Sequence, residues 1–325
     1  MKWTEHVDRP ESITATTIVH IPMLKGYWEK SLEVLKLCLQ SMRQGTTLPF
    51  DLMVFDNGSC VEVQDYLFDL RQQGEIQYLT LSETNIGKIG AWNFLFLAAP
   101  GEIISYADSD VFFLSGWLEA SIRLLQTFPE AGMVTAQPGF GPLCHRRRNT
   151  VAAARKSSSI TIEEGIDLIP DEYVIALHRG LGQKKEMNRK HQHTNRKDIV
   201  LTRGSTSASV SASHFQFTTT RKVLRTVFPL KATKPMGDVG QFDAELDQAG
   251  FWRLSTTDYL VHHMGNRAPD LREELPWVFT PKSTSEIESS PGSVSPLARF
   301  LENGTVRHFL KLINVWSYNL LYNRS

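Results

Sequence analysis

Apolar residues between Thr16 and Gln137 recur with two alternating periods, two residues and about 3.6 residues. This alternation is typical of strands connected by crossover helices and therefore of a parallel sheet. The expected strands cover residues 17–21, 52–55, 76–81, 103–107 and 132–136, and the expected helices cover residues 32–42, 60–72, 88–98 and 116–128. The predicted fold class is α/β. In open sheets of this class ligands bind beyond the carboxyl ends of the strands, so polar residues there are the first candidates for a site.

The second half of the chain is less regular. Residues 178–203 contain eight Lys or Arg against Glu186 and Asp198, a run too polar for a core. We expect a basic mobile loop there that orders on ligand binding; a solvated charge run is the alternative. Further on, the Ser- and Pro-rich residues 283–296 predict a linker. A terminal amphipathic helix follows, with an apolar face of Val306, Phe309, Leu310, Ile313, Trp316, Leu320 and Leu321.

Composition and charge narrow the class of protein. Lys and Arg number 35, as do Asp and Glu, so no global field draws the chain to nucleic acid or anionic lipid. Cys38, Cys60 and Cys144 are an odd number without CxxC spacing, which favours a reducing compartment over a disulfide scaffold. The start has no apolar leader-like run, and no stretch approaches the ~18 apolar residues of a spanning helix. We expect a cytoplasmic protein whose membrane contact, if any, is peripheral.

The first candidate cluster, Asp56-Asn57-Gly58-Ser59, directly follows the expected strand 52–55. Its carboxylate, amide and hydroxyl groups suit the ribose or base edges of a ligand. The simpler interpretation is a turn, because Asn-Gly is a strong turn dipeptide and Asp or Ser caps helices.

The second cluster, Asp108-Ser109-Asp110, follows the expected strand 103–107. In extended backbone, residues i and i+2 project to the same side, so the two carboxylates are expected to converge while Ser109 points away. Converging carboxylates repel unless a cation lies between them, and Mg²⁺ or Mn²⁺ is usually held by one or two carboxylates plus substrate phosphates. An Asp-rich turn is the alternative.

Two further segments carry groups that suit proton transfer and metal binding. Asp238 opens a predicted helix that ends at Gly250, and its spacing to Gln241 matches a capping box. A carboxylate at a helix N-terminus is also held ionised and is able to take a proton from a hydroxyl. The adjacent His262 and His263 follow an apolar stretch and face opposite ways in a strand, so only one of them serves a given metal site.

Taken together, these segments resemble family 2 glycosyltransferases of the GT-A fold, firmly over residues 13–137 and in part over residues 230–267. The resemblance is carried by Thr17–Ile21, Asp56-Asn57-Gly58-Ser59, Thr84-Asn85-Ile86-Gly87 with Trp92-Asn93, and Asp108-Ser109-Asp110 with Gly116-Trp117. It implies a Rossmann-like, mostly parallel sheet with helices on both faces, an irregular acceptor-side region and the C-terminal helix. The implied division is a donor-binding half over 1–137, an acceptor-binding and catalytic half over 138–282, and the linker and helix over 283–325.

The implied activity is metal-dependent, inverting transfer of a sugar from a nucleoside diphosphate sugar to a hydroxyl of a glycan, a lipid-linked acceptor or another polysaccharide precursor. The implied donor-binding residues are Asp56, Asn57, Gly58, Ser59, Asn85, Lys88, Asn93, Asp108 and Ser109. Mn²⁺ or Mg²⁺ would be held by Asp108, Asp110 and His263, with His262 as the rival histidine. The implied base is Asp238, with Asp243 as its rival, because the family's usual Glu-Asp pair is reduced to one acid in Gly237-Asp238-Val239.

Other functions and partners remain open at this point. A sugar-phosphate nucleotidyltransferase also uses metal-bound carboxylates, but it needs a Gly-rich basic loop after the first strand, which is missing here. A non-catalytic binder of RNA or another polyanion would use residues 178–203, yet that run has no aromatic residue for base stacking, so no nucleic-acid partner is expected. The terminal helix either lies on a membrane surface near a lipid-linked acceptor or docks onto the catalytic domain or a second subunit.

Overall fold

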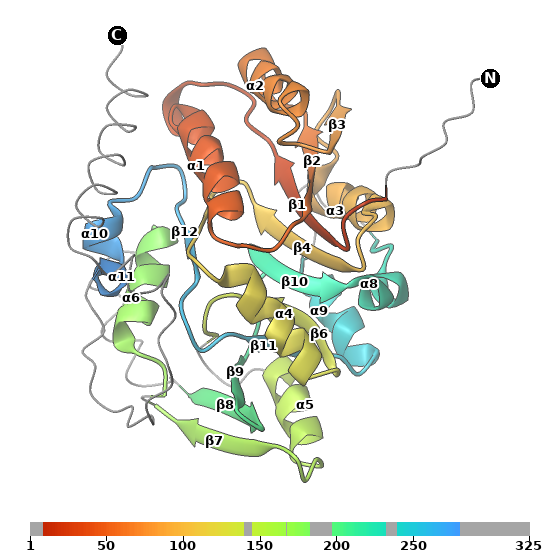
Figure 1. The fold of residues 1–325 in the computed structure, drawn as a ribbon, viewed down its shortest axis with the longest axis vertical. Coiled ribbons are helices and arrows are strands. Elements are labelled where there is room, and N and C mark those ends of the chain that lie inside the picture. The colour runs from red at the N-terminus through yellow and green to blue at the C-terminus, as the bar shows by residue number, and fades with distance from the viewer. Residues whose placement is uncertain (1–8, 140–144, 167, 183–196, 232–238, 280–325) are drawn as a thin grey trace, which may run out of the picture. The chain divides into compact units, whose positions relative to one another are not determined.

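The structure is a computed structural model that describes residues 9–139, 145–166, 168–182, 197–231 and 239–279. The chain divides into two compact units, Met1–Pro276 and Trp277–Ser325. The first unit contains the sheet and the helices that cover it (Figure 1). The predicted linker and terminal helix, residues 283–296 and 306–321, lie outside the described residues.

Strands and helices alternate over the first 135 residues, as the two periods of the sequence predict. The elements are β1 (Ile13–Val19), η1 (Gly26–Trp28), α1 (Ser31–Gln44), β2 (Asp51–Asn57), α2 (Val61–Gln72), β3 (Tyr78–Ser82), α3 (Gly87–Ala98), β4 (Ile103–Asp108), β5 (Val111–Phe113), α4 (Trp117–Thr127) and β6 (Ala131–Thr135). The largest difference from the prediction is at β1, which begins and ends earlier than residues 17–21. Ile13 and Ala15 are buried in the core, and this burial extends the strand toward the N-terminus.

The second half adds antiparallel strands and shorter helices. They are α5 (His145–Ala154), β7 (Thr161–Gly165), α6 (Asp171–Gly180), β8 (Asp198–Arg203), β9 (Thr206–Val210), β10 (Gln216–Thr220), α8 (Arg221–Val227), α9 (Val239–Gln248), β11 (Trp252–Ser255), β12 (Val261–His263), α10 (Leu271–Glu274) and α11 (Pro276–Phe279). The prediction of a loop throughout residues 178–203 is wrong at its ends, because α6 reaches Gly180 and β8 begins at Asp198. Residues 183–196 lie outside the described residues.

Ten strands of the described residues form one sheet in the order β3-β2-β1-β4-β10-β6-β11-β9-β8-β7. The first four strands are parallel to their neighbours. β10 lies between β4 and β6 and is antiparallel to both, while β11 is parallel to β6 and the remaining pairs are antiparallel. The sheet is therefore parallel where it begins and mixed beyond β4. β12 pairs separately with β5.

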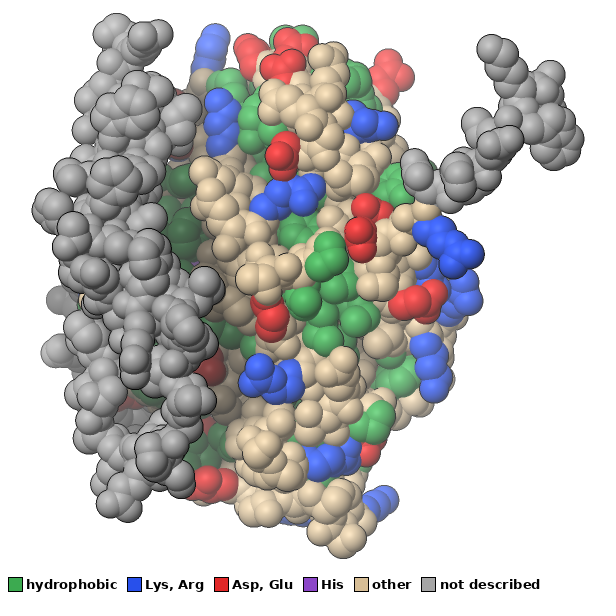
Figure 2. Space-filling model, in the orientation of Figure 1, with side chains coloured by type: hydrophobic (Ala, Val, Ile, Leu, Met, Phe, Trp, Pro, Cys, Tyr) green, Lys and Arg blue, Asp and Glu red, His purple; other side chains and the backbone are tan. Residues whose placement is uncertain are grey.

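Helices cover both faces of the parallel strands, because successive residues of β2 enter different cores. Leu52 and Val54 pack with α1, α2 and α4, whereas Met53 and Phe55 pack with α3, α8 and α9. A third cluster joins α5 to β6, β8, β9 and β11. On the face drawn in Figure 2, acidic and basic side chains are interspersed, in line with the balanced composition. Within the described ranges, no helix combines the length and apolar character that crossing a membrane requires.

Candidate active site

A pocket of about 270 Å³ lies beyond the carboxyl ends of β1, β2 and β4. The sheet register brings these ends together, since Val19 pairs with Asp56 and Ile18 pairs with Asp108. Its walls come from the β1–α1 connection, the start of α3, the turn after β4 and the loop after β12. Of the residues predicted from the sequence, those that line the pocket are Asn57, Asn85, Lys88, Asp108, Ser109 and Asp110. Ser109 was expected to point away from the carboxylates, yet it is part of the wall.

The cluster Asp56-Asn57-Gly58-Ser59 forms a turn, which was the simpler interpretation of its sequence. Asp56 is fully buried, and its Oδ2 accepts hydrogen bonds from the backbone N–H of Ser59 and from Gln64, both at 3.2 Å. The Ser59 hydroxyl accepts a hydrogen bond from the Ile21 N–H at 3.0 Å. Gly58 has φ 81° and approaches the backbone of Asn85 so closely that an added Cβ would lie 3.2 Å from its nitrogen. Asp56, Gly58 and Ser59 therefore shape the wall from behind and do not line it.

Two asparagines connect the end of β2 to the start of α3. Asn57 Oδ1 accepts from the Ile86 N–H at 2.8 Å, and Asn57 Nδ2 donates to Asn85 Oδ1 at 2.9 Å. The same Asn85 oxygen accepts from the Gly87 N–H at 2.8 Å, so it satisfies one of the free donors of the first helical turn. These bonds fix the first turn of α3 at the pocket, and Lys88 follows directly.

Lys88 neutralises Asp108. Its Nζ lies 2.6 Å and 2.9 Å from the two carboxylate oxygens and 5.1 Å from the centre of the Trp92 ring. The hydroxyl of Tyr106 also donates to Asp108 Oδ1. Burial, followed by the negative charge of Asp108, raises the pKa of Tyr106, so the phenol keeps its proton. Both oxygens of Asp108 are therefore engaged by Lys88 or Tyr106, and the negative charge that a metal ion would need is already paired with an ammonium.

Asp110 lines the pocket, and His263 of β12 contacts it from behind. His263 Nε2 lies 3.4 Å from Asp110 Oδ2, and Asp110 Oδ1 is buried with no hydrogen-bond partner among the described residues. His263 Nδ1 lies 3.2 Å from the carbonyl oxygen of Gly180, to which only an N–H is able to bond. In the neutral ring Nε2 then presents a lone pair toward Asp110. Burial raises the pKa of Asp110, while the charge of His263 opposes this rise.

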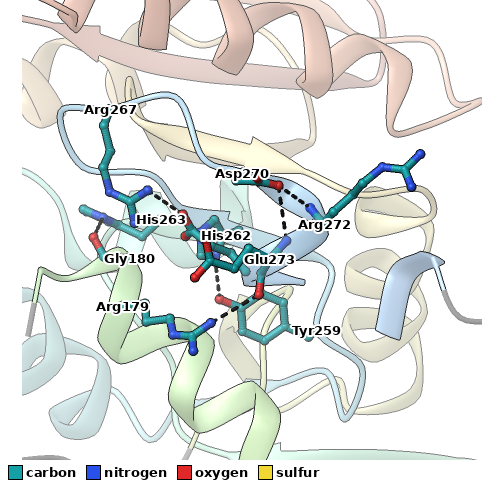
Figure 3. A network of polar contacts seen from close by, with 10 residues as sticks. Arg179, Gly180, Tyr259, His262, His263, Arg267, Asp270, Arg272 and Glu273 are labelled. Atoms are coloured by element: carbon teal, nitrogen blue, oxygen red, sulfur yellow. Dashed lines mark hydrogen bonds and ion pairs between the residues drawn. The ribbon is translucent and has the colours of Figure 1, made fainter. Parts of the chain in front are cut away.

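His262 is a structural residue, which excludes it as the rival metal ligand. Its ring is fully buried, with Nδ1 2.9 Å from the Tyr259 hydroxyl and Nε2 3.0 Å from Glu274 Oε2. Arg267 also bonds to Glu274, at 2.5 Å. Figure 3 shows this network beside His263 and Gly180, where α6, β12 and α10 meet. As the sequence predicts, the two histidines of β12 face opposite ways.

The predicted base Asp238 lies outside the described residues, but its rival Asp243 is placed within α9. Phe242 and Leu246 of this helix are buried, and Gly250 with φ 78° follows its end. Asp243 Oδ1 lies 2.9 Å from His214 Nε2, and Arg253 Nη1 lies 3.4 Å from the other oxygen. With its side chain 6% exposed, Asp243 is too enclosed to meet a substrate hydroxyl directly.

Asn93 is not a donor-binding residue in this structure. Its Nδ2 donates to the carbonyl oxygen of Leu230, and its Oδ1 accepts from the Leu230 N–H, both at 2.8 Å. The side chain thus ties α3 to the segment after α8 and is absent from the pocket wall. The donor-binding role of Asn93 was implied only by the family resemblance.

The residues present fit a divalent cation only in part. No group of three His, Cys, Asp or Glu side chains in the described part of the chain is arranged to hold a metal ion, so the expected set of Asp108, Asp110 and His263 does not converge. Asp110 and His263 do have the chemical groups that bind divalent cations. A carboxylate with an unsatisfied oxygen faces an imidazole lone pair, and the other ring nitrogen bonds a backbone carbonyl, as is usual for metal-binding histidines.

The sequence analysis missed His20, Trp28 and Asn266, all of which line the pocket. His20 Nδ1 lies 2.9 Å from the Asn57 carbonyl oxygen, and its ring meets the edge of Trp28. Asn266 Nδ2 donates to the Tyr27 carbonyl oxygen at 3.0 Å and so joins the loop after β12 to the β1–α1 connection. His20 directly follows β1, and ending the predicted strand at residue 19 would have revealed it.

A sheet with helices on both faces and a polar pocket at the carboxyl ends of its parallel strands matches the GT-A fold that the resemblance implies. The sequence matches the family described as glycosyl transferase family 2 over residues 19–193, more than half of the chain. The chain therefore belongs to this family of glycosyltransferases, and the predicted α/β fold and family are confirmed.

Individual relatives are distant. An uncharacterized glycosyltransferase, alr2836, of Nostoc sp. is 25% identical over 100 residues, which are 31% of this chain and 31% of the relative. Among solved structures, S. aureus TarS 1–349 is 16% identical, with 40% of this chain and 36% of that chain covered and a TM-score of 0.32. The mannosyltransferase PcManGT from Pyrobaculum calidifontis, in complex with GDP-Man and Mn²⁺, is 14% identical, with coverage of 78% and 56% and a TM-score of 0.42. The chain thus spans only about a third to a half of the proteins it matches.

Proposed function

We propose that this chain transfers a sugar from a nucleoside diphosphate sugar to a hydroxyl acceptor, in a single displacement with inversion and with the help of Mn²⁺ or Mg²⁺. The observation that carries the proposal is the pairing of Asp110, which lines the strand-end pocket, with His263 behind it. Their facing atoms lie 3.4 Å apart, and a carboxylate oxygen beside them has no described partner. A cation is the ligand that such a pair of acceptors lacks.

Asp110 and His263 would hold the ion, and the diphosphate of the donor would complete its ligand set. When bound, the ion offsets the negative charge that grows on the departing diphosphate. Lys88 supplies a second positive charge at the same wall. Because Lys88 already neutralises Asp108, we assign Asp108 to the donor rather than to the metal.

The remaining wall residues position the donor. Asn57, Asn85 and Ser109 supply amide and hydroxyl groups to the pocket wall. His20 and Trp28, from the β1–α1 connection, add aromatic ring surface. Asp56 keeps one buried oxygen without a described partner, which leaves it an acceptor position behind the wall. Interactions of the leaving group with Lys88 strengthen as charge develops, so they favour the transition state over the bound substrate.

The test is a thermal-shift panel on the full chain with UDP, GDP, UDP-GlcNAc and GDP-mannose, each with and without Mn²⁺. A ligand at 100 times its Kd stabilises the folded state by ~2.7 kcal/mol, which gives a clear shift. We expect at least one nucleotide to act, and its effect to increase with Mn²⁺ in the wild type but not in Asp110→Asn. Asp65→Asn, an exposed acid on α2, is the control and should match the wild type.

Absence of any shift with all four ligands would contradict the proposal. Incubation with a nucleoside triphosphate and a sugar phosphate distinguishes the nucleotidyltransferase alternative. Release of pyrophosphate in that reaction, without turnover of nucleotide sugars, would replace the proposed function.

A further inference from the structure

An imidazole with a buried carboxylate partner lies next to the pocket, and the donor site does not use it. His214 Nε2 is 2.9 Å from Asp243 Oδ1. The side chain of Asp243 is 6% exposed, whereas that of His214 is 24% exposed. The carboxylate is therefore enclosed, and the imidazole stands between it and solvent.

The surroundings of Asp243 determine which nitrogen of His214 carries the proton. Arg253, with a side chain 7% exposed, places Nη1 3.4 Å from Asp243 Oδ2. A carboxylate beside a buried guanidinium stays ionised and accepts hydrogen bonds, so Nε2 of His214 is the donor. In the neutral ring Nδ1 is then unprotonated. No residue in the described ranges forms a hydrogen bond with Nδ1, which leaves its lone pair available.

The position of β10 brings His214 to the pocket. β10 runs antiparallel to β4, with Gln216 opposite Ala107, so the residues before Gln216 lie beside the acidic turn. The carbonyl oxygen of His214 is 3.4 Å from Lys88 Nζ. The next residue, Phe215, accepts a hydrogen bond from the Asp108 N–H at 2.7 Å and packs against the His263 ring, with 5.5 Å between centroids. The backbone of residues 214 and 215 therefore contacts two residues of the pocket wall, Lys88 and Asp108.

We propose that His214 is the group that accepts the proton of the acceptor hydroxyl, and that Asp243 is the positioning residue that holds its ring. The inference rests on the proposed function. As the acceptor oxygen forms its bond to the anomeric carbon, the bond from that carbon to the diphosphate oxygen breaks and its electron pair leaves with the nucleoside diphosphate. The hydroxyl proton passes to Nδ1 of His214. The imidazolium that results is stabilised through its Nε2–H bond to Asp243.

In this assignment Asp243 positions the His214 ring and does not itself take the proton. His214 then replaces Asp238 as the proposed base. The charged group that contacts the His214 ring is Asp243, whereas Lys88 contacts the carbonyl oxygen of the same residue. Arg253 acts on the ring through Asp243, and Asp247 lies 3.6 Å from Arg253 Nη2 on the far side. The Trp92 ring, 6.4 Å away between centroids, forms the apolar neighbour.

The experiment compares the wild-type full chain with His214→Gln, Asp243→Asn and Asp238→Asn. Two further variants, His214→Ala and Asp247→Asn, serve for chemical rescue and as a control. The readouts are UDP and GDP binding by thermal shift and the pH profile of diphosphate release from UDP-GlcNAc and GDP-mannose with Mn²⁺. We expect His214→Gln to bind nucleotide like the wild type, to lose ~10²–10⁴-fold in turnover and to lose the rise of the rate with pH. Asp247→Asn, the other acid of α9 beside Arg253, is the matched control for Asp243→Asn and should retain turnover. Added imidazole should restore part of the activity of His214→Ala.

A second measurement does not depend on turnover. Nitrogen-15 NMR of histidine-labelled protein should show the Nε2–H tautomer for His214, and Asp243→Asn should change it. The Nδ1–H tautomer would overturn the inference, and so would full turnover in His214→Gln alongside a large loss in Asp238→Asn. If the wild type neither binds nor turns over nucleotides, the proposed function fails and this inference with it. If the wild type is active and His214→Gln is unchanged, only this inference fails.

Discussion

The ammonium of Lys88 lies 2.6 Å and 2.9 Å from the two carboxylate oxygens of Asp108, with a side chain that is 17% exposed. This ion pair lines the candidate pocket and places an ammonium group where a diphosphate would bind. Hydrogen bonds to charged groups contribute ~1.5–3 kcal/mol. We therefore expect Lys88→Met to weaken nucleoside diphosphate binding by roughly 10- to 100-fold, measured by calorimetric titration with UDP and GDP.

Lys88→Arg is the matched variant, because it keeps the charge and the capacity to bond both oxygens of Asp108. It should retain more affinity than Lys88→Met. Equal affinity of Lys88→Met and the wild type would show that the pair holds the wall together without contacting the donor.

We expect Asp110 to make the folded protein less stable at neutral pH. Burial raises its pKa, so the folded state binds this proton more tightly than the unfolded chain does. Such a carboxyl costs nothing below the unfolded value of 3.8, and its cost grows as pH rises from there through the folded pKa. We expect Asp110→Asn to raise Tm at pH 7, by about 2–4 °C for a gain of ~1 kcal/mol, and the gain to vanish toward pH 3.

The measurement is calorimetry of wild type and Asp110→Asn from pH 3 to pH 8, without added metal. Asp65→Asn on the exposed face of α2 is the control and should show no such trend. A variant that is less stable than the wild type at pH 7 would contradict the assignment of Asp110 as a functional residue held at a cost in stability.

Glu274 has the opposite pH dependence. Burial alone would raise its pKa, but hydrogen bonds from His262 and Arg267 outweigh this and lower the pKa to about 2. Its stabilisation is fully present above the ordinary value of 4.5 and is lost as pH falls toward about 2. We expect Glu274→Gln to cost ~1–3 kcal/mol in urea unfolding at pH 7 and progressively less below pH 4.5.

Glu273→Gln is the matched control, since the neighbouring Glu273 of α10 is exposed. Its free energy of unfolding should stay within 0.5 kcal/mol of the wild type, the usual range for surface changes. A loss in Glu274→Gln that is the same at every pH would show that packing, rather than charge, explains its role.

We expect substitution of Asn93 to lower the stability of the fold without changing the affinity for the donor. Its two hydrogen bonds with Leu230 contribute ~1 kcal/mol each, so Asn93→Ala should lower the free energy of unfolding by about 2 kcal/mol. Because the side chain is not part of the pocket wall, the affinity for nucleotide should be unchanged. A large loss of affinity at full stability would return Asn93 to the donor site.

Local patterns predicted the elements of the first half because apolar residues recur at the positions that are buried, on one face of α1 and on both faces of β2. Leu35, Leu39 and Met42 of α1 are all buried, and so are Met53, Val54 and Phe55 in β2. The same reasoning found Asp108 and Asp110, because polar residues at the ends of buried strands have few positions open to them other than the pocket, whereas Lys88 was implied only by the family resemblance.

The rest of the site depends on contacts between residues far apart in the sequence. His214 meets Lys88 across 126 positions, and Asn266 meets Tyr27 across 239. No local period reports such a contact. For the same reason Asn93 was misplaced, since its partner Leu230 follows α8.

The position of β10 in the sheet determines which truncated fragments of the chain are able to fold. Residues 216–220 fill the gap between β4 and β6, although they follow the segment matched to the family, which ends at residue 193. A fragment that stops at that boundary would lack β10 and β11, which leaves β4 with one bare edge and β6 with no neighbour on either side, and bare edges are templates for pairing with another chain. Truncations designed from the family boundary should therefore precipitate, and those that keep β10 and β11 should remain monodisperse.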